Sequence, residues 1–193
     1  MIHDSRPGGR RDFFRDSIGQ WLEKALESTE DRVVQQRYQR PPGALSEMAF
    51  LAACTRCGEC VSACPPKVIQ VVPTSGGLAA GTPFLDVRRS PCIACPTMPC
   101  VQVCPTEALT MPERGWDGYR LGTMEFLPER CVTFRGQVCR ACADACPQGE
   151  KALVIDEATH PVLRQEGCVG CGVCIRACIS VPPSFGFQPT EAK

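Results

Sequence analysis

Hydrophobic positions in the first 42 residues recur at three- and four-residue steps. This period is typical of a helix with one apolar side, and it predicts a helix from about residue 11 to residue 38. Residues 40–43 read Arg-Pro-Pro-Gly, which ends the helix because proline cannot continue it. We therefore expect residues 1–42 to form an N-terminal amphipathic helix and a hinge. The apolar stripe consists of Phe14, Ile18, Trp21, Leu22 and Ala25.

Beyond residue 42 the pattern changes to short apolar runs that predict strands. Residues 68–72 and 152–155 are rich in β-branched side chains, and a third run covers residues 122–127. Eighteen prolines and seventeen glycines fit a fold with many tight turns. These features predict an α+β fold, with a main domain over residues 43–185 and a C-terminal tail over residues 186–193.

Cysteine changes this picture most, because sixteen of the 193 residues are cysteine. In a secreted chain that content would predict a disulfide scaffold. Residues 1–40 contain no apolar segment of an export signal, however, and no run is long enough to span a bilayer. We therefore expect a reducing, cytoplasmic location, where closely spaced cysteines are more often metal ligands than disulfides.

Charge and histidine content exclude two other function classes. Lysine plus arginine (21) balance aspartate plus glutamate (21), so the chain has no global basic field to bind nucleic acid. His3 and His160 are its only histidines, and neither stands in a constellation for acid–base catalysis. The sequence therefore predicts no catalytic residues.

The cysteines form four groups at a nearly constant period. The groups begin at Cys54, Cys92, Cys131 and Cys168, so successive starts are 38, 39 and 37 residues apart. This period predicts one supersecondary unit used four times, each with a ligand loop, a short helix and a strand. Every cysteine belongs to a group, which leaves no thiol for a catalytic nucleophile.

The first group has the spacing Cys54-x2-Cys57-x2-Cys60-x3-Cys64-Pro65, which bacterial ferredoxins use to bind 4Fe–4S clusters. Three thiolates on a tight loop reach three corners of one cluster, and the backbone N–H groups of the loop point at its anionic sulfides. The fourth cysteine, expected at the start of the following helix, turns toward a second cluster.

The other three groups are variants of this spacing. The second and third have longer loops but keep the terminal C-x3-C-P, and the fourth has Ile179 where proline is usual. Zinc, the competing metal, is bound by paired C-x2-C knuckles, a pattern that these groups do not fit. The sequence thus predicts four 4Fe–4S clusters. Besides the first group, their ligands are Cys92, Cys95, Cys100, Cys104, Cys131, Cys139, Cys142, Cys146, Cys168, Cys171, Cys174 and Cys178.

Two pairings of the groups are open. Adjacent pairing joins the first group with the second and the third with the fourth, whereas nested pairing joins the first with the fourth and the second with the third. Nesting is favoured because the outer two groups share the compact loop and the inner two the expanded one. The nested ligand sets are Cys54, Cys57, Cys60 and Cys178; Cys168, Cys171, Cys174 and Cys64; Cys92, Cys95, Cys100 and Cys146; and Cys131, Cys139, Cys142 and Cys104.

These motifs resemble the ferredoxin-type proteins of periplasmic nitrate reduction and methylamine utilisation. The similarity rests on residues 40–45, Ala49-Phe50, the first cysteine group, residues 77–83 and residues 91–100, and it covers roughly residues 40–180. It implies a ferredoxin-like fold with four 4Fe–4S clusters. It also implies that the chain relays electrons between a membrane quinol-oxidising partner and a downstream carrier or reductase.

The N-terminus departs from this family. Members that act outside the cytoplasm carry a twin-arginine signal, and residues 10–14, Arg-Arg-Asp-Phe-Phe, resemble its opening. Arg15, Asp16 and Glu23 then stand where a signal would be uncharged and apolar. The sequence therefore predicts a cytoplasmic protein that associates with the membrane only through a partner, with twin-arginine export to the periplasm as the alternative.

The predicted function is electron transfer by an electron carrier, or by an electron-transfer subunit of an oxidoreductase system, rather than enzymatic catalysis. Its expected partner is a redox protein, for example a membrane quinol dehydrogenase subunit. The alternative is an assembly or maturation factor that loads or reduces a partner oxidoreductase. The N-terminal stripe can dock such a partner or pack on the protein's own core.

Overall fold

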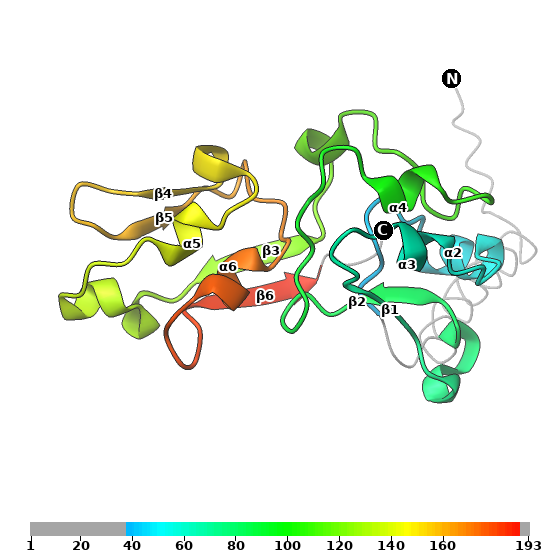
Figure 1. Cartoon of the computed structure of the whole chain (residues 1–193), viewed down its shortest axis with the longest axis horizontal. Helices are drawn as coiled ribbons and strands as arrows, with labels where there is room; N and C mark the ends of the chain where they lie inside the picture. The colour runs from blue at the N-terminus through cyan, green and yellow to red at the C-terminus, as the bar shows by residue number, and fades with distance from the viewer. Residues whose placement is uncertain (1–37, 190–193) are drawn as a thin grey trace, which may run out of the picture. The chain divides into compact units, whose positions relative to one another are not determined.

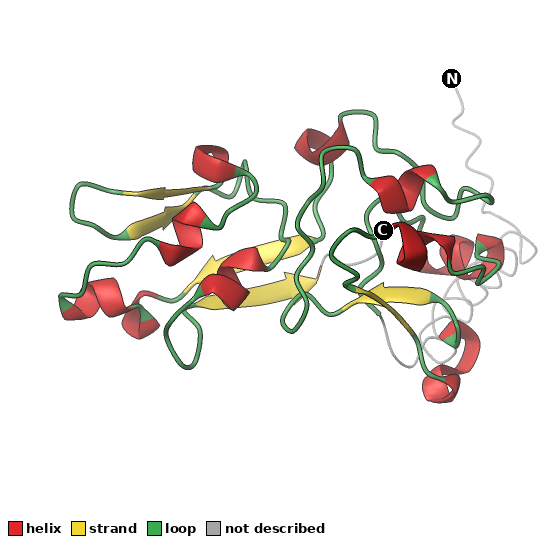
Figure 2. Cartoon of the chain, in the orientation of Figure 1, coloured by secondary structure: helices red, strands yellow, loops and turns green. Residues whose placement is uncertain are grey.

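The computed structural model describes residues 38–189, and Tyr38–Lys193 forms one compact unit. The helix predicted near residues 11–38 lies outside the described residues, apart from Tyr38. In the described part, short helices alternate with short strands, as expected for an α+β fold (Figure 2).

Residues 38–189 contain three two-stranded antiparallel sheets (Figure 1). Two of them are hairpins: β1 (Ile69–Val71) pairs with β2 (Pro83–Leu85), and β4 (Leu153–Ile155) pairs with β5 (Pro161–Leu163). The third joins distant parts of the chain, because β3 (Gly122–Phe126) pairs with β6 (Phe185–Pro189). The three predicted strands are confirmed as β1, β3 and β4, while none of their partners was predicted.

Within residues 38–189, five short α-helices lie between and before these strands. The first is α2 (Glu47–Ala53), which precedes the first cysteine group. Each of the other four contains the third cysteine of one group. These four helices are α3 (Glu59–Ala63), α4 (Pro99–Gln102), α5 (Ala141–Asp144) and α6 (Val173–Ala177).

The fourth cysteine of each group stands at the end of its helix, which corrects the expectation that it begins one. Cys64 and Cys178 cap the C-termini of α3 and α6, and Cys104 and Cys146 follow the caps of α4 and α5 by one residue. A helix of four or five residues carries the chain away from the ligand loop by little more than one turn. The fourth thiol is thereby displaced from the other three.

Five 3-10 helices complete the part of the chain that the structure describes. The β1–β2 connection contains η1 (Thr74–Ala79), and the segment between the second and third cysteine groups contains η2 (Gly115–Gly118). The third group begins between η3 (Pro128–Arg130) and η4 (Val132–Arg135), and η5 (Gly149–Lys151) leads into β4.

Cysteine supplies much of the core. The buried cluster includes large side chains such as Phe50, Met98, Leu121 and Met124, but seven cysteines are buried in the same cluster. Free thiols behave as small hydrophobic groups, and few large apolar side chains surround them here. The packing of this fold therefore depends on whatever the cysteines bind.

The predicted hinge at residues 40–43 is part of the compact unit. Arg40 is only 6% exposed and forms a 2.6 Å ion pair with Glu47 of α2. Its guanidinium also donates to the hydroxyl of Thr82, at 2.7 Å, and to the carbonyl of Pro83, at 2.9 Å. Arg40 therefore holds the start of the compact unit against α2 and β2, so residues 40–42 are fixed to the rest of the unit.

The predicted C-terminal tail is also placed differently. Residues 186–189, expected to lie outside the domain, form most of β6 and pair with β3 along its whole length. Phe185 and Phe187 are buried on the core side of this strand. The alternating burial of β6, with Gly186 and Gln188 less buried, is typical of a strand with one face packed on a core.

Candidate metal centres formed by the cysteine quartets

Three cavities in the compact unit are each lined by four cysteines. We call them cavities I, II and III. In each, three cysteines come from one group and the fourth from the neighbouring group. Cavity I is lined by Cys54, Cys57, Cys60 and Cys104; cavity II by Cys92, Cys95, Cys100 and Cys64; and cavity III by Cys168, Cys171, Cys174 and Cys146.

This arrangement shows that the nested pairing is wrong. Cys64 lies with the second group, where nesting placed it with the fourth, and Cys104 lies with the first group, where nesting placed it with the third. The physical reason is proximity along the chain, because α3 and α4 pack against each other, as do α5 and α6. The first pair exchanges its fourth cysteines, and the third group gives its fourth cysteine, Cys146, to the cavity of the fourth group, so groups pair with their sequence neighbours.

The remaining four cysteines are Cys131, Cys139, Cys142 and Cys178. The first three are close together, since negative charge on Cys139 and Cys131 would raise the pKa of Cys142. Cys178 ends α6, which packs on the helix that contains Cys142. By the symmetry of the two pairs, Cys178 corresponds to Cys104 of cavity I.

Burial suppresses ionisation of the innermost thiols. Desolvation, reinforced by the neighbouring cysteines, raises the pKa of Cys60 to about 11 and those of Cys92 and Cys171 to about 12. The pKa of Cys174 is raised further for the same reasons. Four thiolates can share one cavity only if a cationic centre compensates their charge.

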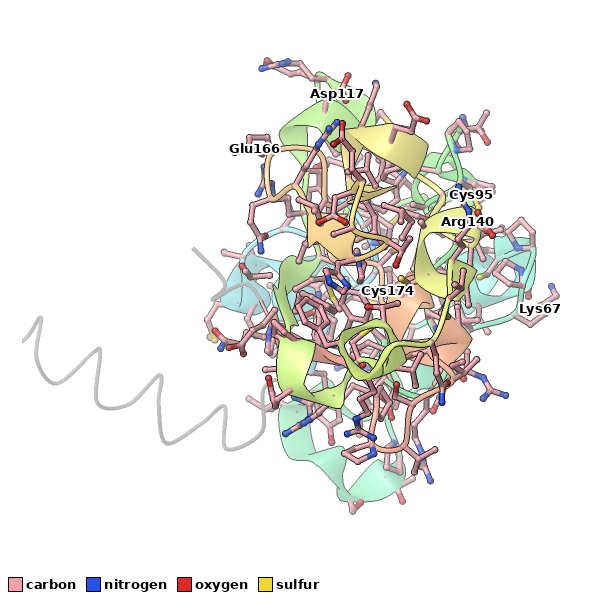
Figure 3. All side chains as sticks on the ribbon, turned by 90° about the vertical axis from the view of Figure 1, so that its left-hand side faces the viewer. Lys67, Cys95, Asp117, Arg140, Glu166 and Cys174 are labelled. Carbon is pink, nitrogen blue, oxygen red and sulfur yellow. The ribbon has the colours of Figure 1, made fainter. Side chains whose placement is uncertain are left out.

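The donor set fits an iron–sulfur cluster. Each cavity presents four soft thiol ligands, and its lining is otherwise mainly apolar, with proline, methionine, leucine or valine. Within residues 38–189, no three Cys, His, Asp or Glu side chains stand close enough together to hold one metal ion. Figure 3 shows Cys174 among the packed side chains, whereas Lys67 and Asp117 project at the edge.

Cys104 and Cys178 both accept backbone hydrogen bonds at their sulfur atoms. Burial opposes ionisation at both, but the donors outweigh it and lower the pKa of each thiol. The backbone N–H of Leu109 lies 3.5 Å from the sulfur of Cys104, and that of Ser184 lies 3.4 Å from the sulfur of Cys178. These two matching environments support the symmetry of the two helix pairs.

The quartets follow one another in a series. Cys60 of cavity I is near Cys100 of cavity II, since its charge would raise the pKa of Cys100. The backbone N–H of Cys92, in cavity II, donates to the carbonyl of Cys171, in cavity III, at 3.1 Å. Cys174 of cavity III is in turn near Cys142 of the last quartet.

Some residues at these sites were not predicted from the sequence. Trp116 lines cavity II, and its indole N–H donates to the carbonyl of Cys95 at 2.8 Å. It therefore covers the expanded loop of the second group. Its position twelve residues after Cys104 gives no local signal, because the contact depends on how the chain returns over the cavity.

The fold and its cysteine quartets define the class as bacterial-ferredoxin-like iron–sulfur proteins. The family described as "4Fe-4S dicluster domain" matches residues 53–108 and 91–150, and the "4Fe-4S binding domain" family matches residues 165–178. The cofactors of this chain are therefore 4Fe–4S clusters, and sixteen cysteines in four quartets fit four of them.

Curated relatives make the assignment more specific. The chain is 35% identical to the ferredoxin-type protein NapG of Escherichia coli over 161 residues, which cover 78% of this chain and 70% of the relative. It is also 35% identical to the methylamine utilization ferredoxin-type protein MauM of Methylorubrum extorquens over 160 residues, covering 79% and 73%. The chain belongs to the family of ferredoxin-type proteins that contains these two relatives.

Membership of this family makes the protein an iron–sulfur electron-transfer protein. The family name and the cluster domains agree with the expectation from the cysteine motifs. Neither favours the alternative of an assembly or maturation factor.

Proposed function

We propose that the chain carries single electrons through four 4Fe–4S clusters, held in series by four ligand sets, and catalyses no reaction of its own. The ligand sets are those of cavities I, II and III, with Cys131, Cys139, Cys142 and Cys178 as the fourth. When bound, 4Fe–4S clusters accept and donate one electron at a time. The chain's own part is to hold them in order, exclude water and donate hydrogen bonds to ligand sulfurs.

The observation that supports this proposal most is that the quartets lie close together in series. The quartets of cavities II and III meet through the hydrogen bond from Cys92 to Cys171. Cys60 lies near enough to Cys100, and Cys142 near enough to Cys174, for the charge of one to raise the pKa of the other. A series with two ends suits a relay, because one end can face a donor and the other an acceptor. A storage or purely structural role would not need such continuity.

Metal analysis of the protein purified without oxygen tests the proposal. We expect about sixteen irons and about sixteen acid-labile sulfides per chain, as four 4Fe–4S clusters require. Reduction with dithionite should give an EPR spectrum of several interacting clusters. Stoichiometric zinc, or about half that iron after anaerobic reconstitution, would contradict four clusters.

The proposed partner is a redox protein, and we favour a quinol-oxidising membrane subunit on the basis of the family resemblance. Membranes that contain such a subunit should reduce the holoprotein when quinol is supplied, at a rate that depends on the membrane protein. A soluble reductase as the sole effective donor would contradict this choice. The same reduction assay is run on a matched variant that lacks the N-terminal 37 residues.

We further propose a cytoplasmic location, with twin-arginine export to the periplasm as the alternative. Among residues 38–189, no helix has the length and hydrophobicity to cross a membrane. Fractionation of cells that produce the chain, before and after inactivation of twin-arginine transport, tests this location. Recovery in the periplasm that requires the transporter would establish the alternative.

A further inference from the structure

The first two cysteine groups form one half of the described residues and the last two groups the other, and these halves meet at backbone atoms near Cys92 and Cys171. We call this contact the junction, and it consists of Val87, Cys92, Cys171 and Gly172. The N–H of Cys92 donates to the carbonyl of Cys171 at 3.1 Å. A Cβ built on Gly172 would lie 2.3 Å from the carbonyl oxygen of Val87. The ligand loop of the fourth group therefore lies directly on the chain that leads into the second group.

Further contacts hold the loop in this position. The N–H of Leu121 donates to the carbonyl of Val169 at 2.9 Å, and a Cβ on Gly170 would lie 2.2 Å from the carbonyl oxygen of Gly122. From the other side, the guanidinium of Arg88 donates to the carbonyl of Phe187 in β6 at 2.9 Å. The loop thus fits closely between the segments before the second group and before β3.

Gly172 has a matched counterpart in the first group. Gly58 caps α3 with φ 79°, and Gly172 caps α6 with φ 83°, so both positions favour glycine for the same conformational reason. They differ in their surroundings, because a Cβ on Gly58 would meet no described atom within 4 Å. Of these two glycines, only Gly172 is required by close approach as well as by backbone conformation.

We infer that Gly172 is a positioning residue: by allowing the two backbones to touch, it sets the separation of the quartets in cavities II and III. This inference rests on the proposed four-centre relay. Ordinary contact for a Cβ begins near 3.4 Å, so a methyl group at 172 would have to move the neighbouring backbone by about 1 Å. Electron transfer between two centres weakens steeply with distance, so the junction controls communication between the halves.

The test compares Gly172→Ala with Gly58→Ala in the full chain, purified with its clusters. Both variants carry the same cost of alanine at positive φ, so their difference reports the junction alone. We expect both to keep the wild-type iron content. In Gly172→Ala, the reduced protein should lose the part of its EPR broadening that arises between the inner clusters, and the amide of Cys92 should exchange about tenfold faster. Gly58→Ala should change neither property.

Arg88→Ala provides an independent variant if Gly172→Ala binds too little iron to be measured. It removes the tie between β6 and the segment that carries Val87, beside the junction, without backbone strain. Arg89→Ala is its control because the Arg89 side chain makes no hydrogen bond or ion pair with the described residues. Arg88→Ala should alter the EPR broadening in the same direction, and Arg89→Ala should not.

The inference fails if Gly172→Ala keeps its iron with an unchanged EPR spectrum and an unchanged exchange rate at Cys92. It also fails if Arg88→Ala, used in its place, behaves like Arg89→Ala. A wild-type protein without iron would contradict the proposed function instead, so the two failures are distinguishable.

Discussion

Cys104 lies in the same cavity as Cys60, although the two residues belong to different cysteine groups. The exchange is reciprocal, since Cys64 of the first group lines the cavity of the second. The first and second groups are therefore held together by two crossed cysteines, Cys64 and Cys104. Loss of the fourth cysteine of one group is expected to damage the cluster whose other three ligands belong to the neighbouring group.

Serine variants of single cysteines test this crossing. Cys104→Ser and Cys54→Ser should perturb the same EPR signal, because both remove a ligand of cavity I. Cys178→Ser should perturb a different signal, since Cys178 belongs to the opposite end of the series. Each variant should lose up to about four irons. A match between Cys178→Ser and Cys54→Ser would restore the nested pairing.

The buried ion pair of Arg40 and Glu47 should contribute strongly to stability. Their side chains are only 7% and 12% exposed, so removal of one partner leaves a buried charge without compensation. We expect Arg40→Ala to lower the free energy of unfolding by about 3–5 kcal/mol, measured by denaturant titration of the holoprotein under argon.

The exposed pair of Arg140 and Asp144 is the matched control, since both side chains are 63% exposed. Arg140→Ala should change the free energy of unfolding by less than about 0.5 kcal/mol. Equal effects of Arg40→Ala and Arg140→Ala would show that the buried pair has no special role.

Removal of iron should unfold much of residues 38–189. Seven cysteines belong to the buried core, and four thiols around an empty cavity leave apolar surface without packing partners. Treatment with a chelator and an oxidant should therefore abolish the cooperative thermal transition seen by circular dichroism and make the chain sensitive to protease. An apoprotein that keeps its transition would show that the cysteines pack adequately by themselves.

The hydroxyl of Ser184 should tune the reduction potential of one centre. The thiol of Cys178 donates to this hydroxyl at 3.6 Å. Once the sulfur is a deprotonated ligand it can only accept, so the hydroxyl then donates to it and favours the more negative, reduced state. Ser184→Ala should lower the potential of that centre by about 20–40 mV, the equivalent of at most about 1 kcal/mol for one electron, in an EPR-monitored titration.

Ser62→Ala, an exposed substitution on α3, is the control for this titration. All four potentials should be unchanged in that variant. An unchanged set of potentials in Ser184→Ala as well would mean that the hydroxyl of Ser184 does not tune this centre, and that the backbone N–H of Ser184 and the groups of Ser180 set the environment of Cys178.

The sequence by itself determined which atoms carry the chemistry. Three thiols at C-x2-C-x2-C spacing reach one cluster because the loop between them is short, so their grouping depends on local geometry alone. The same locality explains the strands at β1, β3 and β4, where short β-branched or apolar runs stand beside turns.

Only the tertiary structure decided how distant segments combine. The fourth cysteine of a group stands at the end of a short helix, so the cluster it can bind depends on which helix packs nearby. For this reason Cys64 lies in the cavity of the second group and Cys104 in that of the first. The pairing of β3 with β6, the burial of Arg40 and the contact at Gly172 are equally long-range. No spacing along the chain encodes such contacts, because they arise where separate parts of the fold meet.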